Sequence, residues 1–553
     1  MRIGLIHYVY NNDSLKYFWG SSFDIALGDR HEIFHLPREF YNASKSGRWE
    51  ILKDLCDKCD VLMGEFYTEA LECREQMGKP LPLIGNLSGL MSRGGGNIRN
   101  VAQYLKTTDI IIGNCTGDLG ITKKFFNNAE MRVLPFSYDE AAYYPVDASQ
   151  RRLIKTSKGF SNSDKILLYS GRLTLEKNLH TVLGIYSVLQ ALIPDLHLVI
   201  AGVGRDTPFY ELGVFTMGID NVLRRLADKL GIDKTRIHFV GRVDGKEIRE
   251  LYNIADALIN LTIFHDENFG LAQVESMACG TPVIGTKWGG LRDTIIDGET
   301  GYHVSTYTTP YGVKVNWWEA IDNIAYLLSS QSEYDLFRRN SREHAIRNYS
   351  MEAFRRTLES ILSDCVEINN KKATAPIELT SFGREFWETC VHRDGDCPPY
   401  RRGPRAFELY REMIDPFTGL TDRAFRGLER LRPGSIMCLA SPVRISESGR
   451  VFVNDPIFPF DLDIPDDNRD TIISALTGFM NEPAMTYGRL TRRLTEEFDD
   501  STVAITWLLD SGLVLCMDPG RSNVGPEGIN PLIGAPLLTI QTIDYKTDVL
   551  ALR

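Results

Sequence analysis

The sequence has 553 residues, of which 43% are hydrophobic and 24% are charged, and its formal net charge is −11. This composition is typical of globular proteins and excludes global disorder, collagen and a long coiled coil. The acidic balance gives no support for a surface that binds nucleic acid or anionic lipid. No apolar run approaches the roughly 18 residues of a membrane-spanning helix, and no signal-peptide core follows Met1. We therefore expect a cytoplasmic protein without a membrane span, and its length predicts three to four domains.

Two series of short apolar strands alternate with amphipathic helical segments up to about residue 365. The first series comprises residues 2–7, 61–63, 81–85, 110–113 and 131–135, and the second comprises 166–170, 197–201, 237–240, 257–261 and 283–286. Such alternation predicts parallel sheets covered by helices, because parallel neighbours need crossover connections. A link at 144–149 separates the series. The expected α/β architecture is two doubly wound, Rossmann-like domains that face each other across a cleft.

The composition changes near residue 369, and beyond Lys372 the sole lysine is Lys546. Residues 376–432 look helical and predict a connector. Residues 433–516 combine β-like runs at 436–439, 443–445 and 451–453 with helical segments at roughly 470–480, 487–498 and 501–511, which predicts an α+β, winged-helix-like module. Residues 517–553 resemble a tail. Acidic clusters in the module argue against DNA as its partner.

The stretch from His265 to Thr286 carries the strongest chemical signal. Glu267 follows a predicted strand, and Glu275 lies on a helix predicted to begin near Phe269. A helix N-terminus attracts phosphate, and carboxylates accept hydrogen bonds from sugar hydroxyls. One local element could thus hold the phosphates, ribose and sugar of a nucleotide sugar. Taken singly, Glu267 could be an N-terminal helix charge and Glu275 a solvated helix residue.

Other residues near strand ends favour the functional interpretation. Arg172 and Lys177 lie at a strand-to-helix turn, where cations suit a diphosphate leaving group, although solvated cations are common in loops. Arg242 and Val243 follow another strand, where the backbone could meet a base. Gly289-Gly290 permits a tight turn close to a ligand.

An ordered set of motifs spans about 130 residues: Ser-Gly-Arg-Leu-Thr-Leu-Glu-Lys-Asn at 170–178, Val-Gly-Arg-Val at 240–243, the paired glutamates, Gly-Thr-Pro-Val at 280–283, Gly-Gly at 289–290 and Asp-Gly-Glu-Thr-Gly at 297–301. This set closely resembles that of family 4 (group 1) glycosyltransferases, which are retaining enzymes of the GT-B type. The resemblance implies an acceptor-side domain at 1–145, a nucleotide-sugar domain at 146–348 and a return helix at 349–367 that completes the first domain.

The resemblance also implies the roles of individual residues. The implied catalytic residues are Glu267, at the hydroxyls of the transferred sugar, and Arg172 and Lys177, at the donor diphosphate. The implied donor-binding residues are Arg242 and Val243 beside the base, Glu275 at the ribose, and Asn268, Phe269, Gly270 and Leu271 around the helix mouth. Such enzymes generally need no metal or other cofactor, and the co-substrate would be a UDP-, GDP-, dTDP- or ADP-sugar. The implied mechanism is a front-face displacement that retains the anomeric configuration.

One position in the first half departs from the family pattern. Relatives often have a histidine after the strand predicted at 81–85, where this sequence has Asn86. That histidine commonly contacts the transferred sugar, so Asn86 is the candidate acceptor or sugar contact. Its amide can still donate and accept hydrogen bonds.

The predicted module resembles, more weakly, the peptide-recognition modules of enzymes that modify ribosomal peptides. This resemblance would imply a leader peptide on the edge strand of the module and a peptide or small-molecule acceptor. The module could equally serve only to stabilise the chain or to form a homodimer. Two other activities remain open, namely a sugar phosphorylase or synthase on the same core and a non-catalytic peptide- or protein-binding scaffold.

Overall fold

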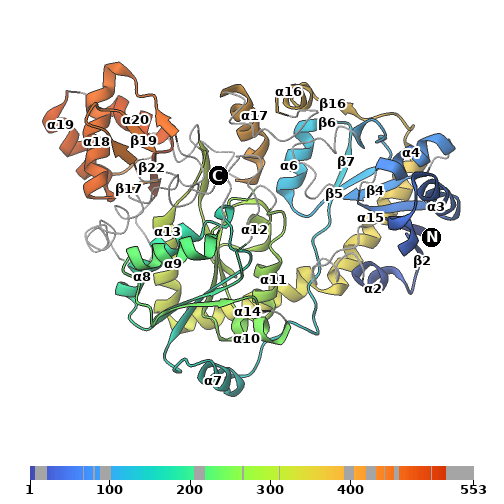
Figure 1. The fold of residues 1–553 in the computed structure, drawn as a ribbon, viewed down its shortest axis with the longest axis horizontal. Coiled ribbons are helices and arrows are strands. Elements are labelled where there is room, and N and C mark those ends of the chain that lie inside the picture. The colour runs from blue at the N-terminus through green and yellow to red at the C-terminus, as the bar shows by residue number, and fades with distance from the viewer. Residues whose placement is uncertain are drawn as a thin grey trace.

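The computed structural model describes residues 1–6, 21–65, 68–78, 81–86, 101–204, 218–243, 245–264, 267–309, 312–390, 404–418, 431–440, 443–453, 460–499 and 501–517. Two α/β halves lie side by side, and a carboxyl-terminal module lies at the opposite end of the molecule from the amino-terminal half (Figure 1). Within the described residues, no helix is both long enough and apolar enough to cross a membrane. The predicted tail lies outside the described residues except for Met517.

The amino-terminal half is built on a six-stranded parallel sheet with the order β2-β1-β3-β4-β5-β7. Its strands are β1 (Arg2–Ile6), β2 (Glu32–His35), β3 (Val61–Glu65), β4 (Leu83–Asn86), β5 (Ile110–Gly113) and β7 (Glu130–Val133), and its helices are α2 (Phe23–Leu27), α3 (Lys45–Lys58), α4 (Thr68–Met77) and α6 (Thr116–Phe125), with the 3-10 helix η2 (Arg38–Asn42). The inner strands β4 and β5 are buried along their whole length, as expected of parallel strands covered on both faces.

The second half contains another six-stranded parallel sheet, with the order β10-β9-β8-β11-β12-β13. Its strands are β8 (Lys165–Ser170), β9 (Leu196–Ala201), β10 (Ile237–Gly241), β11 (Ala257–Asn260), β12 (Val283–Thr286) and β13 (Gly301–Val304). Its helices are α7 (Ala148–Ser157), η3 (Leu175–Lys177), α8 (Leu179–Leu192), α9 (Ile219–Lys229), α10 (Gly245–Ile254), α11 (Leu271–Ala278), α12 (Gly289–Thr294), α13 (Trp317–Ser329) and α14 (Gln331–Tyr349), and β14 (Thr306–Thr309) and β15 (Gly312–Val315) form a hairpin. This is the Rossmann strand order, which reverses between β8 and β11. The predicted pair of Rossmann-like halves is confirmed.

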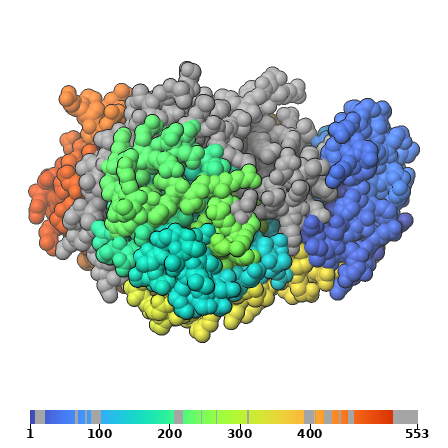
Figure 2. Space-filling model, turned by 60° about the horizontal axis from the view of Figure 1, so that its bottom comes forward, coloured from blue at the N-terminus to red at the C-terminus, as the bar shows by residue number. Residues whose placement is uncertain are grey.

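A long helix returns the chain from the second half to the first. Figure 2 shows the yellow segment along the bottom of the molecule, below the green and cyan atoms, reaching toward the blue amino-terminal half. This helix, α15 (Met351–Lys371), is joined to the first half by an ion pair between Arg132 and Asp364. The predicted bounds of 349–367 are wrong because Ser350 is extended and its hydroxyl accepts a hydrogen bond from the backbone of Ala353. Tyr349 therefore ends α14.

The connector of the extension packs on the amino-terminal half. Strand β16 (Glu378–Leu379) pairs with β6 (Phe126–Asn127), and α16 (Ser381–Cys390) packs on α6 through the rings of Phe386 and Phe125, 5.2 Å apart. After residues 391–403, which lie outside the described residues, come α17 (Pro404–Ile414) and η5 (Asp415–Phe417).

The carboxyl-terminal module has its own apolar core and docks on the second half. Its elements are β17 (Ile436–Leu439), β18 (Val443–Ile445), β19 (Val451–Val453), β20 (Phe460–Leu462), η8 (Asp466–Asn468), α18 (Arg469–Asn481), β21 (Ala484–Thr486), α19 (Tyr487–Glu497), α20 (Thr502–Asp510) and β22 (Val514–Met517). The indole N–H of Trp317 donates to the carbonyl of Leu439 at 2.7 Å, which fixes the module to α13. Its first three strands and its three helices lie where the sequence predicts them.

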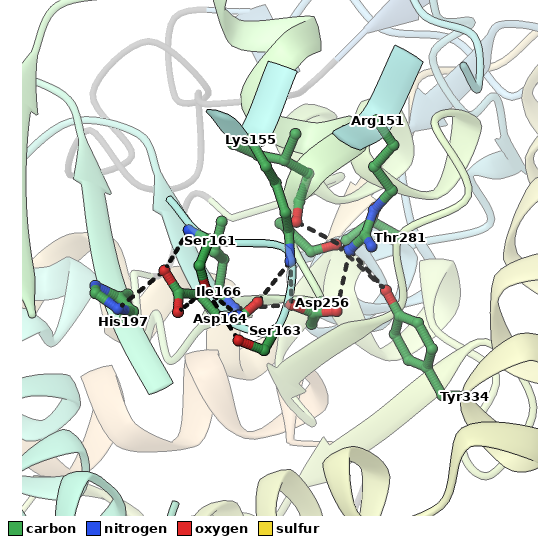
Figure 3. Close-up of polar contacts among 12 residues, drawn as sticks. Arg151, Lys155, Ser161, Ser163, Asp164, Ile166, His197, Asp256, Thr281 and Tyr334 are labelled. Atoms are coloured by element: carbon green, nitrogen blue, oxygen red, sulfur yellow. Dashed lines mark hydrogen bonds and ion pairs between the residues drawn. The ribbon is translucent and has the colours of Figure 1, made fainter. Parts of the chain in front are cut away.

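Buried charges fasten the beginning of the second half to its sheet. Asp256, just before β11, forms ion pairs with Arg151 and Lys155 of α7 and accepts a hydrogen bond from the backbone of Ile166 on β8 (Figure 3). These contacts hold α7 against the amino ends of the two central strands, β8 and β11. The positions of these strands, and of the loops at their carboxyl ends, are thereby fixed.

Candidate functional site

The candidate site lies where the strand order of the second sheet reverses. Strand β8 ends at Ser170 and leads to Arg172 and, in η3, to Lys177. Its neighbour β11 ends at Asn260 and leads into the loop that carries Glu267. Because the two strands are parallel, both loops leave the same edge of the sheet, where open α/β sheets bind ligands.

Lys177 and Glu267 form an ion pair across these two loops. Lys177 is only 9% exposed. The η3 turn that carries it is tied to the loop after β11, because the backbone N–H of Ile263 donates to the carbonyl of Glu176 at 3.0 Å. The fold therefore joins the predicted cation and the predicted carboxylate, which are 90 residues apart in the sequence.

One aromatic ring supports both predicted cations. The ring centroid of Phe264 lies 5.7 Å from the guanidinium carbon of Arg172 and 5.7 Å from Nζ of Lys177. Both distances are in the range of cation–π attraction. The two positive groups thus gather over one ring, which gives the site the charge needed for an anionic ligand such as a diphosphate.

The glycines of the Gly-Gly motif allow α12 to press against the loop of Glu267. A Cβ atom at Gly289 would lie 2.2 Å from the carbonyl oxygen of Glu267, and one at Gly290 would lie 2.3 Å from the backbone nitrogen of Phe269. The N–H of Gly290 donates to the carbonyl of Glu267 at 2.7 Å. A larger residue at either position would push this loop away from Lys177.

Glu275 lies on α11, buried beside two tyrosines. The hydroxyl of Tyr252 donates to its carboxylate at 3.1 Å and lies 3.2 Å from the hydroxyl of Ser170 at the end of β8. Burial raises the pKa of the Glu275 carboxyl to about 7, although hydrogen bonds from Tyr252 and Tyr143 act in the opposite direction. The carboxyl is thus poised to change its charge near neutral pH.

Helix α11 begins at Leu271, two residues later than predicted, because Gly270 precedes it in the left-handed region with φ 87°. Around this helix mouth, Phe269 is buried with its ring 5.2 Å from that of Phe136 in the first half. The side-chain amide of Asn268 donates to that of Asn114 at 3.3 Å, also across the two halves. These residues therefore close the junction between the halves as well as flanking the helix N-terminus.

Three predicted residues lie apart from the Lys177–Glu267 pair. Arg242 is exposed and Val243 half-buried at the end of β10, two strands from β8. Asn86 is buried at the end of β4 in the first half, beside β5, whose chain continues to Asn114. Asn86 thus lies at the same edge of the first sheet as Asn114, the hydrogen-bond partner of Asn268.

Sequence reasoning missed several residues that shape the site, namely Phe264, Trp288, Tyr252, Tyr143 and Asn114. Each is a side chain of an ordinary core or loop type, without a spacing that points to chemistry. In the described part of the chain, no three histidine, cysteine or acidic side chains are grouped as a metal centre would require.

Comparisons with known proteins show what the second half of the chain is similar to. Residues 150–344 match the model described as glycosyl transferases group 1. Mannosylfructose-phosphate synthase from Agrobacterium fabrum (strain C58 / ATCC 33970) is 28% identical over 193 residues, which are 35% of this chain and 39% of that protein. N-acetyl-alpha-D-glucosaminyl L-malate synthase from Bacillus anthracis is 29% identical over 175 residues, or 32% of this chain and 40% of that protein. The chain spans less than half of the length of both relatives.

The solved structure of Anabaena Alr3699/HepE in complex with UDP has a TM-score of 0.50 and 16% identity. The superposition covers 66% of this chain and 99% of that one. At this identity the likeness concerns the fold, and the predicted GT-B arrangement is confirmed.

Proposed function

We propose that the chain transfers a sugar from a nucleoside-diphosphate sugar to an acceptor, and the match of residues 150–344 to the model of group 1 glycosyl transferases supports this. The observation that carries this proposal is the Lys177–Glu267 ion pair at the reversal point of the sheet, with Arg172 over the same Phe264 ring. A cation pair facing a carboxylate suits a ligand that has a diphosphate at one end and hydroxyls at the other. The relative crystallised with UDP has the same fold.

We assign roles as follows within this proposal. Arg172 and Lys177 stabilise the charge that develops on the diphosphate when the bond to the anomeric carbon breaks. The N-terminus of α11, at Gly270 and Leu271, adds backbone N–H groups to the same phosphates. Glu267 accepts hydrogen bonds from the transferred sugar, and Glu275 accepts them from the ribose. The base would lie against Arg242 and Val243.

The proposed reaction retains the anomeric configuration. The acceptor hydroxyl attacks from the face that the diphosphate leaves, and its proton passes to the leaving phosphate, so that no protein nucleophile is needed. Asn86 of the first half would contact the sugar or the acceptor, and Asn268 of the second half would contact the donor.

A thermal-shift panel of UDP-, GDP-, dTDP- and ADP-sugars tests the function. We expect one donor to stabilise the protein, by about 2.7 kcal/mol at one hundred times its Kd. Glucose 1-phosphate is the matched control without a nucleotide. Stabilisation by this sugar phosphate alone would instead favour a phosphorylase, and stabilisation by none of the five would favour a scaffold.

The raised pKa of Glu275 predicts that donor binding depends on pH. The ribose hydroxyls donate hydrogen bonds, so the ionised carboxylate is the form that binds. Because burial raises the pKa of this carboxyl to about 7, the carboxyl is protonated below that pH. We expect the Kd of the preferred nucleotide sugar to rise by up to about tenfold per pH unit as the pH falls below 7. Calorimetry between pH 5.5 and 8.5 measures it.

The Glu275→Gln variant is the control for this pH dependence. The amide of this variant does not titrate. The Kd of the variant should therefore be higher than that of the unmodified protein at pH 8.5 and nearly constant over the same pH range. The nucleotide sugar is used instead of the free diphosphate because a terminal phosphate titrates near pH 6. An unchanged slope in the variant would remove Glu275 from the donor site.

We further propose that the module receives a peptide acceptor. The antiparallel sheet β18-β19-β20 ends at the edge strand β18, and α18 packs beside this strand. A strand edge next to a helix is an arrangement that can add an extended peptide. Truncation after Arg432 would remove this edge while retaining the connector, and unchanged turnover of a peptide acceptor would leave the module a structural or dimerisation role.

A further inference from the structure

At η5 the connector passes between α6 of the first half and α12 of the second half, a contact that we call the joint. Helix α17 runs down toward α12 beside α6 (Figure 1), and η5 follows it directly. Phe417, the last residue of η5, is only 1% exposed although it belongs to a short turn of the extension. A ring buried to this extent must be packed against other elements, so the turn is part of the folded core and does not merely cross the surface.

The first half has a surface that fits η5. Gly117 and Gly120 lie one turn apart on α6. A Cβ atom at Gly117 would lie 2.6 Å from Cδ1 of Phe417, and one at Gly120 would lie 2.6 Å from Cβ of Pro416. Helix α6 thus accepts the ring and the proline only because it carries glycine at both positions.

The second half meets the same ring. Phe417 packs edge-to-face on Trp288, with ring centroids 5.6 Å apart and an interplanar angle of 90°. A Cβ atom at Gly289 would lie 3.4 Å from Cδ2 of Phe417. The ring is therefore in contact with both Rossmann-like halves at once.

Arg292 on α12 closes the joint with polar contacts. Its guanidinium donates to the carbonyl of Pro416 at 2.7 Å and to the hydroxyl of Thr116 on α6. The hydroxyl of Thr116 in turn donates to Asp293 at 2.8 Å. Three segments of the chain, α6, α12 and η5, are thereby locked together.

Trp288 links the joint to the donor site. The indole N–H of Trp288 donates to the carbonyl of Phe264 at 2.8 Å, and the same oxygen accepts the backbone N–H of Glu267 at 2.9 Å. The ring of Phe264 supports Arg172 and Lys177. Whatever fixes Trp288 therefore fixes the turn that presents Glu267 and the ring under both cations.

We propose that Phe417 is a positioning residue of the donor site, which sets the separation of the two halves and fixes Trp288 and the turn of Glu267. The carboxyl-terminal extension is thus part of the catalytic unit and not only an attached module. This inference deepens the proposed function and rests on it for its kinetic consequence.

Phe417→Ala, with the donor of the transfer reaction varied, tests the proposal. Removing the ring frees Trp288 and opens the joint, so kcat should fall roughly 10- to 100-fold, as for an ångström-scale misplacement of catalytic groups. The donor KM should change much less, because Glu275 on α11 and the pair Arg242 and Val243 after β10 lie outside the joint. Phe417→Leu retains most of the apolar volume and should recover most of kcat.

Phe386→Ala is the matched control. Phe386 is also an aromatic residue of the extension and is 2% exposed. It packs on Phe125 of the same helix α6, so its contact is with the first half, whereas Phe417 contacts both halves. Both variants should lose a similar amount of thermal stability, and only Phe417→Ala should lose kcat. Equal losses of kcat in the two variants would overturn the positioning role.

A distance measurement makes the test independent of turnover. Spin labels attached through Lys53→Cys on α3 and Lys234→Cys before β10 report the separation of the halves, since both lysines are exposed and the nine cysteines of the described residues are buried. Phe417→Ala should broaden the distance distribution, and Phe386→Ala should leave it unchanged. An unchanged distribution in Phe417→Ala would overturn the proposal even if transfer were observed.

The failures of the two proposals are distinguishable. If no nucleotide sugar supports transfer but Phe417→Ala broadens the distance distribution, the proposed function fails while the structural role of Phe417 between the halves is upheld. If Phe417→Ala does not fold, Trp288→Phe replaces it as the test. This variant keeps a ring but removes the N–H donated to Phe264, so kcat should fall while the distance distribution stays unchanged. Normal kcat in Trp288→Phe would break the inferred link between joint and site.

Discussion

Lys177→Ala is expected to lower kcat/KM for nucleotide-sugar turnover by roughly 10²- to 10³-fold, the effect of removing one group that stabilises transition-state charge. Lys177 is held in η3, faces Glu267 and lies over Phe264 with Arg172. In the proposed reaction its ammonium group meets the diphosphate as negative charge develops there. Initial-rate kinetics with the preferred donor measure the loss, and Arg172 accounts for the activity that remains.

A second ion pair of the same half provides the control. Lys158 pairs with Glu250 at 3.1 Å, and both side chains are 21% exposed. This pair joins α7 and α10, away from Phe264. Lys158→Ala should therefore change kcat/KM by less than about twofold, as expected for a pair of little energetic weight. Similar losses of kcat/KM in Lys158→Ala and Lys177→Ala would show that the effect is not specific to the position of Lys177.

Destabilisation must be separated from lost catalysis. Lys177→Ala leaves the carboxylate of Glu267 without its partner in a place where the side chain is only 12% exposed. The double variant Lys177→Ala, Glu267→Gln removes both charges, so its unfolding temperature should recover toward that of the unmodified protein while turnover stays low. Recovery of turnover together with stability would assign the defect to folding and remove Lys177 from the reaction.

The meeting of the candidate site residues could be predicted from the sequence because the order of the strands in a parallel sheet decides which loops lie together. Arg172 and Lys177 follow β8, and Glu267 follows β11. Once both runs are recognised as parallel strands, their carboxyl ends must share an edge. The glycines at 289 and 290 carry a second readable signal, since their motif marks a close approach that the structure places on the loop of Glu267.

The partners of these residues could not be predicted, since they come from general packing. Tyr252 lies on the buried face of α10 like the neighbouring Leu251, and nothing in its spacing shows that its hydroxyl meets Glu275. Phe264 and Trp288 likewise have the composition of any core. Phe417 is the extreme case, because no local pattern connects it with residues more than 100 positions earlier in the chain.

Element bounds show the same limit on a smaller scale. The edge strand β2 is absent from the predicted series, because its two apolar residues, Ile33 and Phe34, lie between polar residues and form too short a run to predict a strand. The separation of α14 from α15 depends on one extended serine, Ser350, whose capping role is local. The return helix predicted from residue 349 therefore begins two residues too early, because the cap at Ser350 is not used in placing its start.

Asp256→Ala is expected to destabilise the protein by about 3–5 kcal/mol, the cost of removing one partner from a buried charge cluster. The side chain of Asp256 is 2% exposed and contacts Arg151 at 3.0 Å and Lys155 at 3.9 Å (Figure 3). It also accepts the backbone N–H of Ile166 at 2.8 Å. The variant leaves two cations without this carboxylate and one buried N–H without its acceptor. Urea denaturation followed by circular dichroism measures the change in the free energy of unfolding.

An exposed pair and an isosteric variant make this prediction specific. Glu367 pairs with Lys371 on the surface of α15, where the two side chains are 62% and 70% exposed. Glu367→Ala should cost less than about 1 kcal/mol, because water solvates both charges and holding the pair costs side-chain entropy. Asp256→Asn keeps an acceptor for Ile166 but removes the charge, so its cost should lie between the two. If Asp256→Asn were as stable as the unmodified protein while Asp256→Ala lost the full amount, the stability would come from the hydrogen bond that joins Asp256 to β8 and not from the two ion pairs with α7.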